Sequence, residues 1–334
     1  MKTVLVTGGA GFIGSHFAHT LLQDKDCSVI VFDLLTYAGR RENLDDLETH
    51  PRFQFVQGDI RDRKAVDAVM AQSQWVVHFA AETHNDRAIL DAGEFVLTDV
   101  FGTYTLLESA RSCGIERFLH VSTDEVYGSI EDGRFSEDSR IEPNMPYAAS
   151  KAGGELMARA YFKTHGLPLI IARPSNTFGP NQYPEKMMPL FITNAIDDEP
   201  LPIYGQGQQI RDWLYVLDNC SALKLILEHA PVGEVYNVGA NEEHRNIDVA
   251  LIILELLGKP KSLIQHVADR PGHDCRYALN ADKLGGLGWK PQFEFNKALE
   301  NTVQWYVNNQ QWWRAIKEKQ IEYQAFTKEW YKDR

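Results

Sequence analysis

A glycine-rich turn near the N-terminus constrains the fold of this chain more than any other feature. The stretch VLVTGGAGFIGS places Gly8, Gly11 and Gly14 between an apolar run and a helix-length segment, and a second apolar run ends at Asp33. Glycines at these points allow a tight turn, let backbone N–H groups approach a pyrophosphate and let the helix pack closely on the strand. The pattern is typical of a dinucleotide-binding unit, in which the acid binds the ribose hydroxyls.

Asp33 also predicts which dinucleotide is bound. Its carboxylate would repel a 2′-phosphate, and the two leucines that follow it offer that phosphate no cation. The sequence therefore favours NAD over NADP.

Apolar runs of strand length alternate with helix-length segments through the first half of the chain. They lie at residues 3–8, 28–33, 53–59, 75–81, 118–124 and 168–174. Continuous apolar runs are expected of parallel strands that are buried on both faces. We therefore predict an α/β fold, with a doubly wound parallel Rossmann sheet and a smaller, interleaved C-terminal substrate lobe.

The domain boundaries follow from where this alternation breaks. Residues 176–211 are rich in Pro and Gly and are predicted to form loops with one short helix, after which a strand and a helix return. The prediction is an NAD-binding domain of residues 1–175, rejoined by about 213–240, and a nucleotide-sugar-binding lobe of residues 176–212 and 241–334.

Composition excludes several classes of partner. The formal net charge of -12 argues against a nucleic-acid or anionic-membrane surface, because both need an excess of Lys and Arg. No apolar run reaches the ~18 residues of a membrane span, and the N-terminus enters a strand with no room for a signal peptide. The four cysteines lack metal-ligand spacing, so we expect reduced thiols, no metal site and a cytoplasmic location.

Tyr147 and Lys151 are the first candidate catalytic pair. They lie four residues apart in PYAASK, at the start of a predicted helix, and so share one face. A free phenol has a pKa near ~10, and an adjacent ammonium together with a cationic nicotinamide favours the phenolate. The alternative is a surface pair on an amphipathic helix, but the preceding glycine fingerprint favours the catalytic interpretation.

Asp124 and Glu125 are the second candidate pair, at the end of the strand in VSTDEVYG. Ligands of doubly wound sheets lie beyond the carboxyl ends of the strands. Because successive strand residues point to opposite faces, both acids can serve one substrate only if the strand has ended near Ser122 or Thr123. The alternative is a solvated helix N-cap.

Together these motifs resemble a known superfamily. TGGAGFIGS, GDIRD, FAAETHNDR, VSTDEVYG, PYAASK, RPSNTFGPNQYPEKMMP, QQIRDWLYV and ADRPGHDCRYALN are similar to segments of the extended short-chain dehydrogenase/reductases. The resemblance is strongest to the nucleotide-sugar 4,6-dehydratases of the dTDP-glucose 4,6-dehydratase type. It covers the chain to about residue 313.

The resemblance implies a reaction with net loss of water. Tyr147, with Thr123 bound to the same oxygen, would take the proton of the sugar 4-hydroxyl while the C4 hydride passes to NAD. Glu125 would remove the C5 proton, and protonated Asp124 would donate to the departing C6 hydroxyl. The hydride then returns to C6 and C5 is reprotonated, which gives a 4-keto-6-deoxy sugar. Lys151 completes the expected catalytic set.

The resemblance also implies the binding residues and a homodimer. His84 is expected as a supporting group and not a metal ligand, and helices at 99–112 and 147–164 are expected to pair across a two-fold axis as a helix bundle. NAD is expected to contact Gly8, Gly11, Phe12, Ile13, Gly14, Asp33, Asp59, Ile60, Ala80, Ala81, Thr98, Tyr147 and Lys151. The nucleotide sugar is expected to contact His84, Asn176, Lys186, Tyr204, Arg211, Asn246, Arg270, His273 and Tyr277.

Three features depart from the family pattern. Asn85 stands where an apolar residue is more common, and Asp99 stands where asparagine is more common. The aromatic tail 314–334 lies outside the resemblance and is predicted to be a docked helix.

Two other functions stay open at this point. A 4-epimerase or decarboxylase of the same superfamily would not need Asp124 with Glu125, and a non-catalytic NAD-binding regulator would not need Tyr147 with Lys151. The sequence does not identify the nucleoside base or the hexose, and dTDP-glucose is the leading candidate.

Overall fold

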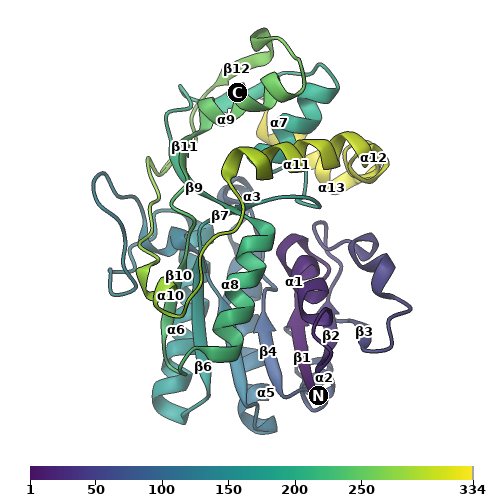
Figure 1. Ribbon diagram of the computed structural model, residues 1–334, viewed down its shortest axis with the longest axis vertical. Coiled ribbons are helices and arrows are strands. Elements are labelled where there is room, and N and C mark those ends of the chain that lie inside the picture. The colour runs from purple at the N-terminus through teal and green to yellow at the C-terminus, as the bar shows by residue number, and fades with distance from the viewer. Residues whose placement is uncertain (333–334) are drawn as a thin grey trace.

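A parallel sheet of seven strands forms the base of the molecule. The computed structural model describes residues 1–332, and in it the strand order is β3-β2-β1-β4-β5-β6-β10 (Figure 1). Because the order reverses beside β1, the sheet is doubly wound and the predicted fold class is confirmed. The strands are β1 (Lys2–Thr7), β2 (Cys27–Asp33), β3 (Phe53–Gln57), β4 (Trp75–His78), β5 (Arg117–Val121), β6 (Leu169–Pro174) and β10 (Val235–Val238).

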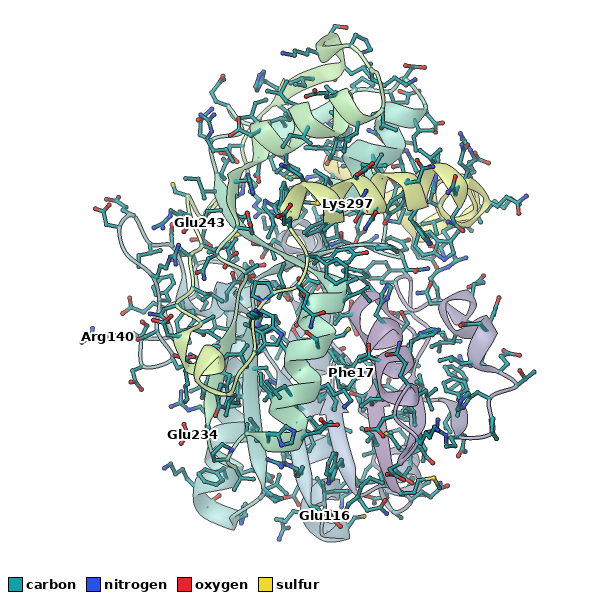
Figure 2. All side chains as sticks on the ribbon, in the orientation of Figure 1. Phe17, Glu116, Arg140, Glu234, Glu243 and Lys297 are labelled. Atoms are coloured by element: carbon teal, nitrogen blue, oxygen red, sulfur yellow. The ribbon has the colours of Figure 1, made fainter. Side chains whose placement is uncertain are left out.

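Helices cover both faces of this sheet. On one face, α1 (Phe12–Leu22) and α8 (Val216–His229) pack together with Val4 and Val6 of β1, and Phe17 lies between the two helices (Figure 2). On the other face, Leu5 packs with three helices, α2 (Arg63–Met70), α5 (Thr103–Cys113) and α6 (Pro146–His165). Alternate residues of β1 therefore enter different cores, which is why its sequence is continuously apolar.

A smaller lobe lies over the carboxyl ends of the strands (Figure 1). It holds a three-stranded sheet of β7 (Asn176–Phe178), β9 (Ile210–Tyr215) and β11 (Glu243–Arg245), and a pair formed by β8 (Leu201–Tyr204) and β12 (Ile264–Val267). Its helices are α7 (Met187–Ile196), α9 (Asn246–Leu256) and α11 (Phe295–Asn308), whereas α10 (Asp282–Gly286) packs against β10 of the large sheet.

The prediction of loops with one short helix at 176–211 was wrong in part. The helix is α7, but β7, β8 and the start of β9 also lie in this segment. β7 and β8 have three and four residues, and their partners β9 and β12 come later in the chain. Strands this short carry no period of their own, so only their distant partners define them.

The tail forms two helices rather than one, α12 (Gln310–Lys319) and α13 (Ile321–Trp330). Tyr323, Phe326 and Trp330 of α13 are buried, and the ring of Tyr323 meets that of Tyr183 edge-on. The tail is thus part of the packed structure up to the last described residues.

The remaining elements are short. They are α3 (Asn85–Leu90), α4 (Gly93–Phe95), a π-helical segment (Val96–Gly102) and 3-10 segments at Arg41–Leu47, Asp124–Tyr127 and Lys261–Leu263. Within residues 1–332, no helix combines the length and apolarity needed to cross a membrane.

Candidate active site

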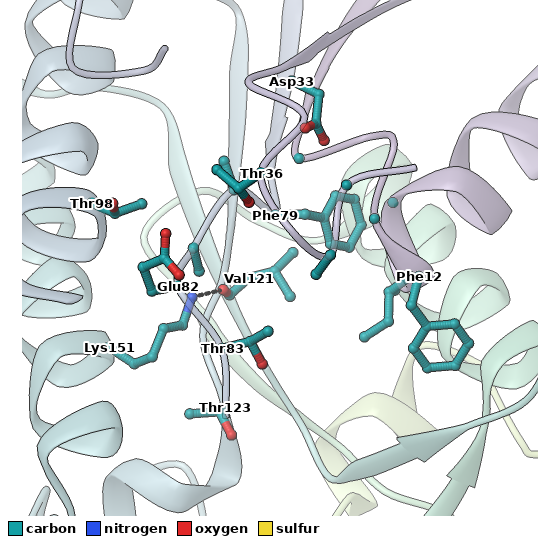
Figure 3. Close-up of a pocket in the computed structure, with 18 of the residues that line it drawn as sticks. Phe12, Asp33, Thr36, Phe79, Glu82, Thr83, Thr98, Val121, Thr123 and Lys151 are labelled. Carbon is teal, nitrogen blue, oxygen red and sulfur yellow. Dashed lines mark hydrogen bonds between the residues drawn. The ribbon is translucent and has the colours of Figure 1, made fainter. Parts of the chain in front are cut away.

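One cavity at the carboxyl ends of β1, β2, β4 and β5 gathers the predicted residues (Figure 3). Its lining includes every residue expected to contact NAD, the five expected catalytic residues and two of the expected substrate residues. These are Gly8, Gly11, Phe12, Ile13, Gly14, Asp33, Asp59, Ile60, Ala80, Ala81, Thr98, Thr123, Asp124, Glu125, Tyr147, Lys151, Asn176 and Lys186. Residues so far apart in sequence meet because parallel strands end at one edge of the sheet.

Sequence reasoning missed part of the lining. Thr36, Phe79, Glu82, Thr83, Gln182 and Tyr183 also line the cavity. They lie outside the regular elements, where no periodic pattern marks a side chain as facing a ligand.

The glycine turn is shaped for close approach of a ligand. Gly8 has a φ of +69°, and a Cβ there would lie 2.5 Å from the backbone nitrogen of Ala80. A Cβ on Gly14 would overlap the carbonyl oxygen of Gly8. No other residue fits either position, so the turn brings β1 and β4 together and leaves the start of α1 open to a phosphate.

Asp33 holds the same turn in place. Its Oδ2 accepts a hydrogen bond from the backbone N–H of Ala10 at 2.9 Å, and its Oδ1 accepts one from that of Leu35 at 2.8 Å. Burial raises the pKa of this carboxyl, and the two backbone hydrogen bonds oppose that rise.

Several polar atoms around the cavity lack a protein partner. Buried polar atoms are nearly always hydrogen-bonded, so such a group marks a place for a polar ligand. With the glycine turn and Asp33, they fit a dinucleotide and a second polar molecule. The atoms are Ser122 Oγ, Asp124 Oδ2, Ser175 Oγ, Asn176 Oδ1 and Gln182 Oε1.

The two acids follow a strand that has already ended. β5 stops at Val121, and Thr123 caps a 3-10 turn by accepting a hydrogen bond from the backbone N–H of Glu125 at 3.3 Å. Asp124 is 2% exposed and Glu125 is 9% exposed. The prediction that the strand ends before the acids is confirmed, and the pair is not a solvated helix cap.

The surroundings of Asp124 favour its neutral form. Burial raises its pKa well above the usual value, and the carboxylates of Glu125 and Asp212 raise it further. The hydroxyl of Thr123 lies 3.2 Å from its Oδ1. A buried acid that stays protonated beside a second carboxyl group can donate a proton at neutral pH.

Tyr147 and Lys151 project from the first turns of α6. The ammonium of Lys151 donates to the carbonyl oxygen of Val121 at 2.9 Å (Figure 3). Burial raises the pKa of Tyr147 well above its usual value, and the carboxyl groups of Glu125, Asp99 and Asp124 add to that rise. A positive charge nearby would favour the phenolate, and Lys151 lies on the same face of α6 as Tyr147.

Asp99 anchors the elements around this pair. It lies in the π-helical segment, where its carboxyl group accepts from the backbone N–H of Glu82 at 2.9 Å and from the Ser150 hydroxyl at 2.5 Å. Burial raises its pKa to about 6, while the Lys151 ammonium and the Ser150 hydrogen bond oppose that rise. The extra carboxyl group thus fastens α6 to the loop after β4.

This raised pKa makes the effect of Asp99→Asn dependent on pH. A carboxyl whose pKa is raised on folding binds more protons in the folded state, so it lowers stability as pH rises from about 4 to about 6. At pH 8 we expect Asp99→Asn to have a free energy of unfolding about 1–2 kcal/mol larger than that of the parent. The variant should therefore melt at a higher temperature. The difference should vanish near pH 4 in paired thermal melts. A constant difference across that range would contradict the buried, titrating carboxyl.

A network of charged and aromatic side chains surrounds one side of the site. Arg270 pairs with Asp86 at 3.1 Å, and the Tyr204 hydroxyl donates to the other oxygen of Asp86 at 2.6 Å. The indole of Trp330, in the tail, donates to the Tyr204 hydroxyl. His273 meets the Tyr204 ring edge-on. The expected substrate cation Arg270 is therefore already paired with an acid.

Arg211 lies behind the site rather than at its surface. It is 5% exposed, donates to the carbonyl oxygens of Ile210 and Asp274, and lies 4.3 Å from the centre of the Tyr277 ring. The Tyr277 hydroxyl donates to Asp274 and also lies 3.4 Å from Glu125 Oε2. Arg211 therefore supports an aromatic residue that reaches the catalytic acid.

Of the expected substrate residues not yet described, one lines the cavity and two lie outside its lining. Lys186 lines the cavity and donates to the Thr83 hydroxyl at 2.9 Å. His84 is buried, and its Nε2 lies 3.2 Å from the carbonyl oxygen of Glu185. Asn246 begins α9, outside the cavity lining. In the described part of the chain, no three His, Cys, Asp or Glu residues are grouped as a metal site.

Comparison with known proteins gives matches along nearly the whole chain. The model of the GDP-mannose 4,6 dehydratase family matches residues 5–302. The low-salt glycan biosynthesis protein Agl12 of Haloferax volcanii is 50% identical over 92% of this chain and 99% of its own length. The dTDP-glucose 4,6-dehydratase of an Actinoplanes species is 48% identical over 93% of this chain and 99% of its own length. The crystal structure of DesIV, a dTDP-glucose 4,6-dehydratase from Streptomyces venezuelae with NAD bound, is 48% identical, has a TM-score of 0.92 and covers 94% of this chain and 99% of its own.

Proposed function

Because this chain belongs to the GDP-mannose 4,6-dehydratase family, we propose that it is an NAD-dependent lyase that dehydrates a nucleoside-diphosphate hexose to its 4-keto-6-deoxy form, with dTDP-glucose as the favoured substrate. The observation that carries this proposal is the buried Asp124–Glu125 pair, which lines the same cavity as Tyr147 and Lys151. Oxidation alone, or epimerisation, has no need of a neutral acid beside a base.

The chain's own residues divide the proton transfers. Bound NAD would take a hydride from the sugar C4 and return it to C6. Tyr147, oriented by the start of α6 and with Lys151 on the same helix face, takes the proton of the 4-hydroxyl. Glu125 removes the C5 proton, which the new 4-ketone has made more acidic, and Asp124, whose neutral form burial favours, protonates the leaving C6 hydroxyl. When the hydride returns to C6, a proton returns to C5, so that water is the only net loss.

We assign the nucleotide sugar to the lobe formed by residues 176–212 and 241–334, of which 333–334 lie outside the described residues. Asn176 and Lys186 line the cavity on this side, and Asn176 Oδ1 is buried without a protein partner. A diphosphate needs cations in an acidic protein, and the lobe supplies Lys186 and Arg270 close to the catalytic acids.

The test is turnover of a panel of dTDP-, UDP-, CDP- and GDP-hexoses by the purified protein, followed by mass spectrometry and by the alkaline absorbance of 4-keto sugars. Loss of one water from dTDP-glucose is the expected result. Turnover without loss of mass would favour an epimerase, and loss of carbon dioxide from a nucleotide-linked uronic acid, added to the panel, would favour a decarboxylase. Failure of every nucleotide sugar, with NAD bound, would favour a regulatory protein.

We also propose that two copies of the chain pair through α5 and α6. Large apolar side chains are exposed along the π-helical segment, α5 and α6: Val96, Leu97, Phe101, Tyr104 and Leu156. Large apolar side chains exposed on neighbouring helices favour a protein interface, and two helices from each copy would form a bundle. The cytoplasmic location remains a prediction from the sequence.

Acidic side chains introduced into this surface should prevent two copies of the chain from pairing. Phe101 is 48% exposed and Leu156 is 53% exposed, so the double variant Phe101→Glu with Leu156→Glu leaves the core intact. It is expected to elute as a monomer in size-exclusion chromatography with light scattering, whereas the parent is expected to elute as a dimer. Leu256→Glu, at an exposed position on α9, is the matched control and should stay dimeric. A dimeric double variant would rule out this surface.

A further inference from the structure

We infer that Asn85 positions Glu125 for removal of the C5 proton; this inference rests on the proposed function. The amide nitrogen of Asn85 donates to Glu125 Oε2 at 2.7 Å, between two buried side chains. The Tyr277 hydroxyl, at 3.4 Å, lies against the same oxygen. Hydrogen bonds to a carboxylate are stronger than those between neutral groups, so the amide fixes the rotation of the carboxylate plane.

The other oxygen of Glu125 is left for the reaction. Within residues 1–332, Oε1 receives no hydrogen bond, although Glu125 lines the cavity. A base must keep one oxygen free to accept the proton and must hold it in a fixed direction. Asn85 and Tyr277 together leave Glu125 in this state.

The local backbone is arranged around this contact. Asn85 is the first residue of α3, and the residue before it, His84, has a φ of 92°. A side chain other than glycine rarely adopts such an angle, and strain of this kind is concentrated at functional sites. His84 is held by the carbonyl oxygen of Glu185 and by the Phe326 ring.

Asn85 is a poor choice for stability alone. Its Oδ1 is buried and has no hydrogen-bond partner, which costs free energy that an apolar side chain of similar shape would not. The amide nitrogen is the end that has a partner, because it donates to Glu125.

The inference predicts a loss that is confined to one step. Asn85→Leu, of similar shape, is expected to lower kcat for dehydration about 10- to 100-fold, the range for losing a hydrogen bond to a charged group. KM for the nucleotide sugar and the melting temperature should stay close to the parent. In deuterated buffer, exchange at C5 should slow by the same factor, while single-turnover oxidation at C4 keeps its rate.

Asn85→Asp keeps the shape of the side chain and is the second variant. A carboxylate against Glu125 disfavours its charged form, so the acidic limb of the kcat profile should move to higher pH. The groups that already face Glu125 are Asp124, Tyr147, Lys186, Arg270 and Tyr277, and they are unchanged in both variants.

Asn219→Leu is the matched control. Asn219 is also buried, donates one hydrogen bond, to Thr177, and has an unpartnered Oδ1, but it lies on α8 away from the acids. It should leave the ratio of C5 exchange to C4 oxidation unchanged. If the parent is active, C5 exchange at the parent rate in Asn85→Leu would overturn the role of Asn85. Slowing of C5 exchange and C4 oxidation by the same factor would also overturn it. A parent that dehydrates no nucleotide sugar would instead overturn the proposed function.

Discussion

Replacing Glu125 with Gln is expected to stop dehydration while sparing oxidation at C4. Gln keeps the size of the side chain and can keep the contact with Asn85, but it cannot accept a proton at neutral pH. The loss in kcat should be about 100- to 10,000-fold, the usual contribution of a general base. Because Tyr147 is untouched, the absorbance of the reduced cofactor should rise in a single turnover and then persist.

Two measurements separate this result from general damage. Deuterium incorporation at C5 from heavy water should disappear in Glu125→Gln, and binding of the nucleotide sugar by calorimetry should remain. Glu300→Gln, at an exposed position on α11, is the matched control and should behave as the parent does. Dehydration by Glu125→Gln at the parent rate would show that another group removes the C5 proton.

Replacing Tyr147 with Phe is expected to abolish the first step instead. The variant loses only the hydroxyl, so the ring still packs edge-on to Phe95. Without a group to take the 4-hydroxyl proton, oxidation at C4 should slow by about 100- to 10,000-fold, and dehydration should slow with it. No absorbance of the reduced cofactor should appear, in contrast to Glu125→Gln.

The control for Tyr147 lies on the same helix. Tyr161 of α6 donates its hydroxyl to Glu108, at a distance from the cavity lining, so Tyr161→Phe should retain full activity. NAD binding, followed by fluorescence, should be intact in both variants. If Tyr147→Phe oxidised C4 as fast as the parent, the phenol would be a substrate contact and not the base.

Much of the fold could be predicted because its signals are local. Strands buried on both faces are continuous apolar runs, so β1 and β2 were located within one residue of their observed bounds. The part of the site expected to bind the cofactor could also be predicted from the sequence, because Gly8 and Asp33 occupy fixed places relative to those strands. The end of β5 before Asp124 followed from geometry alone, since two neighbouring acids cannot otherwise face one ligand.

The rest of the site depends on contacts between distant segments. The Asn85 amide meets Glu125 across 40 positions of sequence, and the pairing of Arg270 with Asp86 spans 184. No spacing rule connects such residues, so Asn85 and Asp99 could be recognised as departures but not placed. Arg211 was expected to contact the nucleotide sugar, and in the structure its guanidinium lies over the Tyr277 ring. Its position depends on the packing of β9 on the segment 268–279, which no local pattern predicts.

The position of α13 has a consequence for how the protein is made. The tail packs against two residues that were expected to contact the nucleotide sugar. Phe326 lies against His84, with the guanidinium of Arg87 over its ring, and Trp330 donates to the Tyr204 hydroxyl. On the ribosome, the glycine turn and its strands emerge early, whereas these contacts need residues 326–330 to be translated. The strands around the glycine turn can therefore dock before residues 326–330 are translated, whereas the contacts at His84 and Tyr204 form only after them.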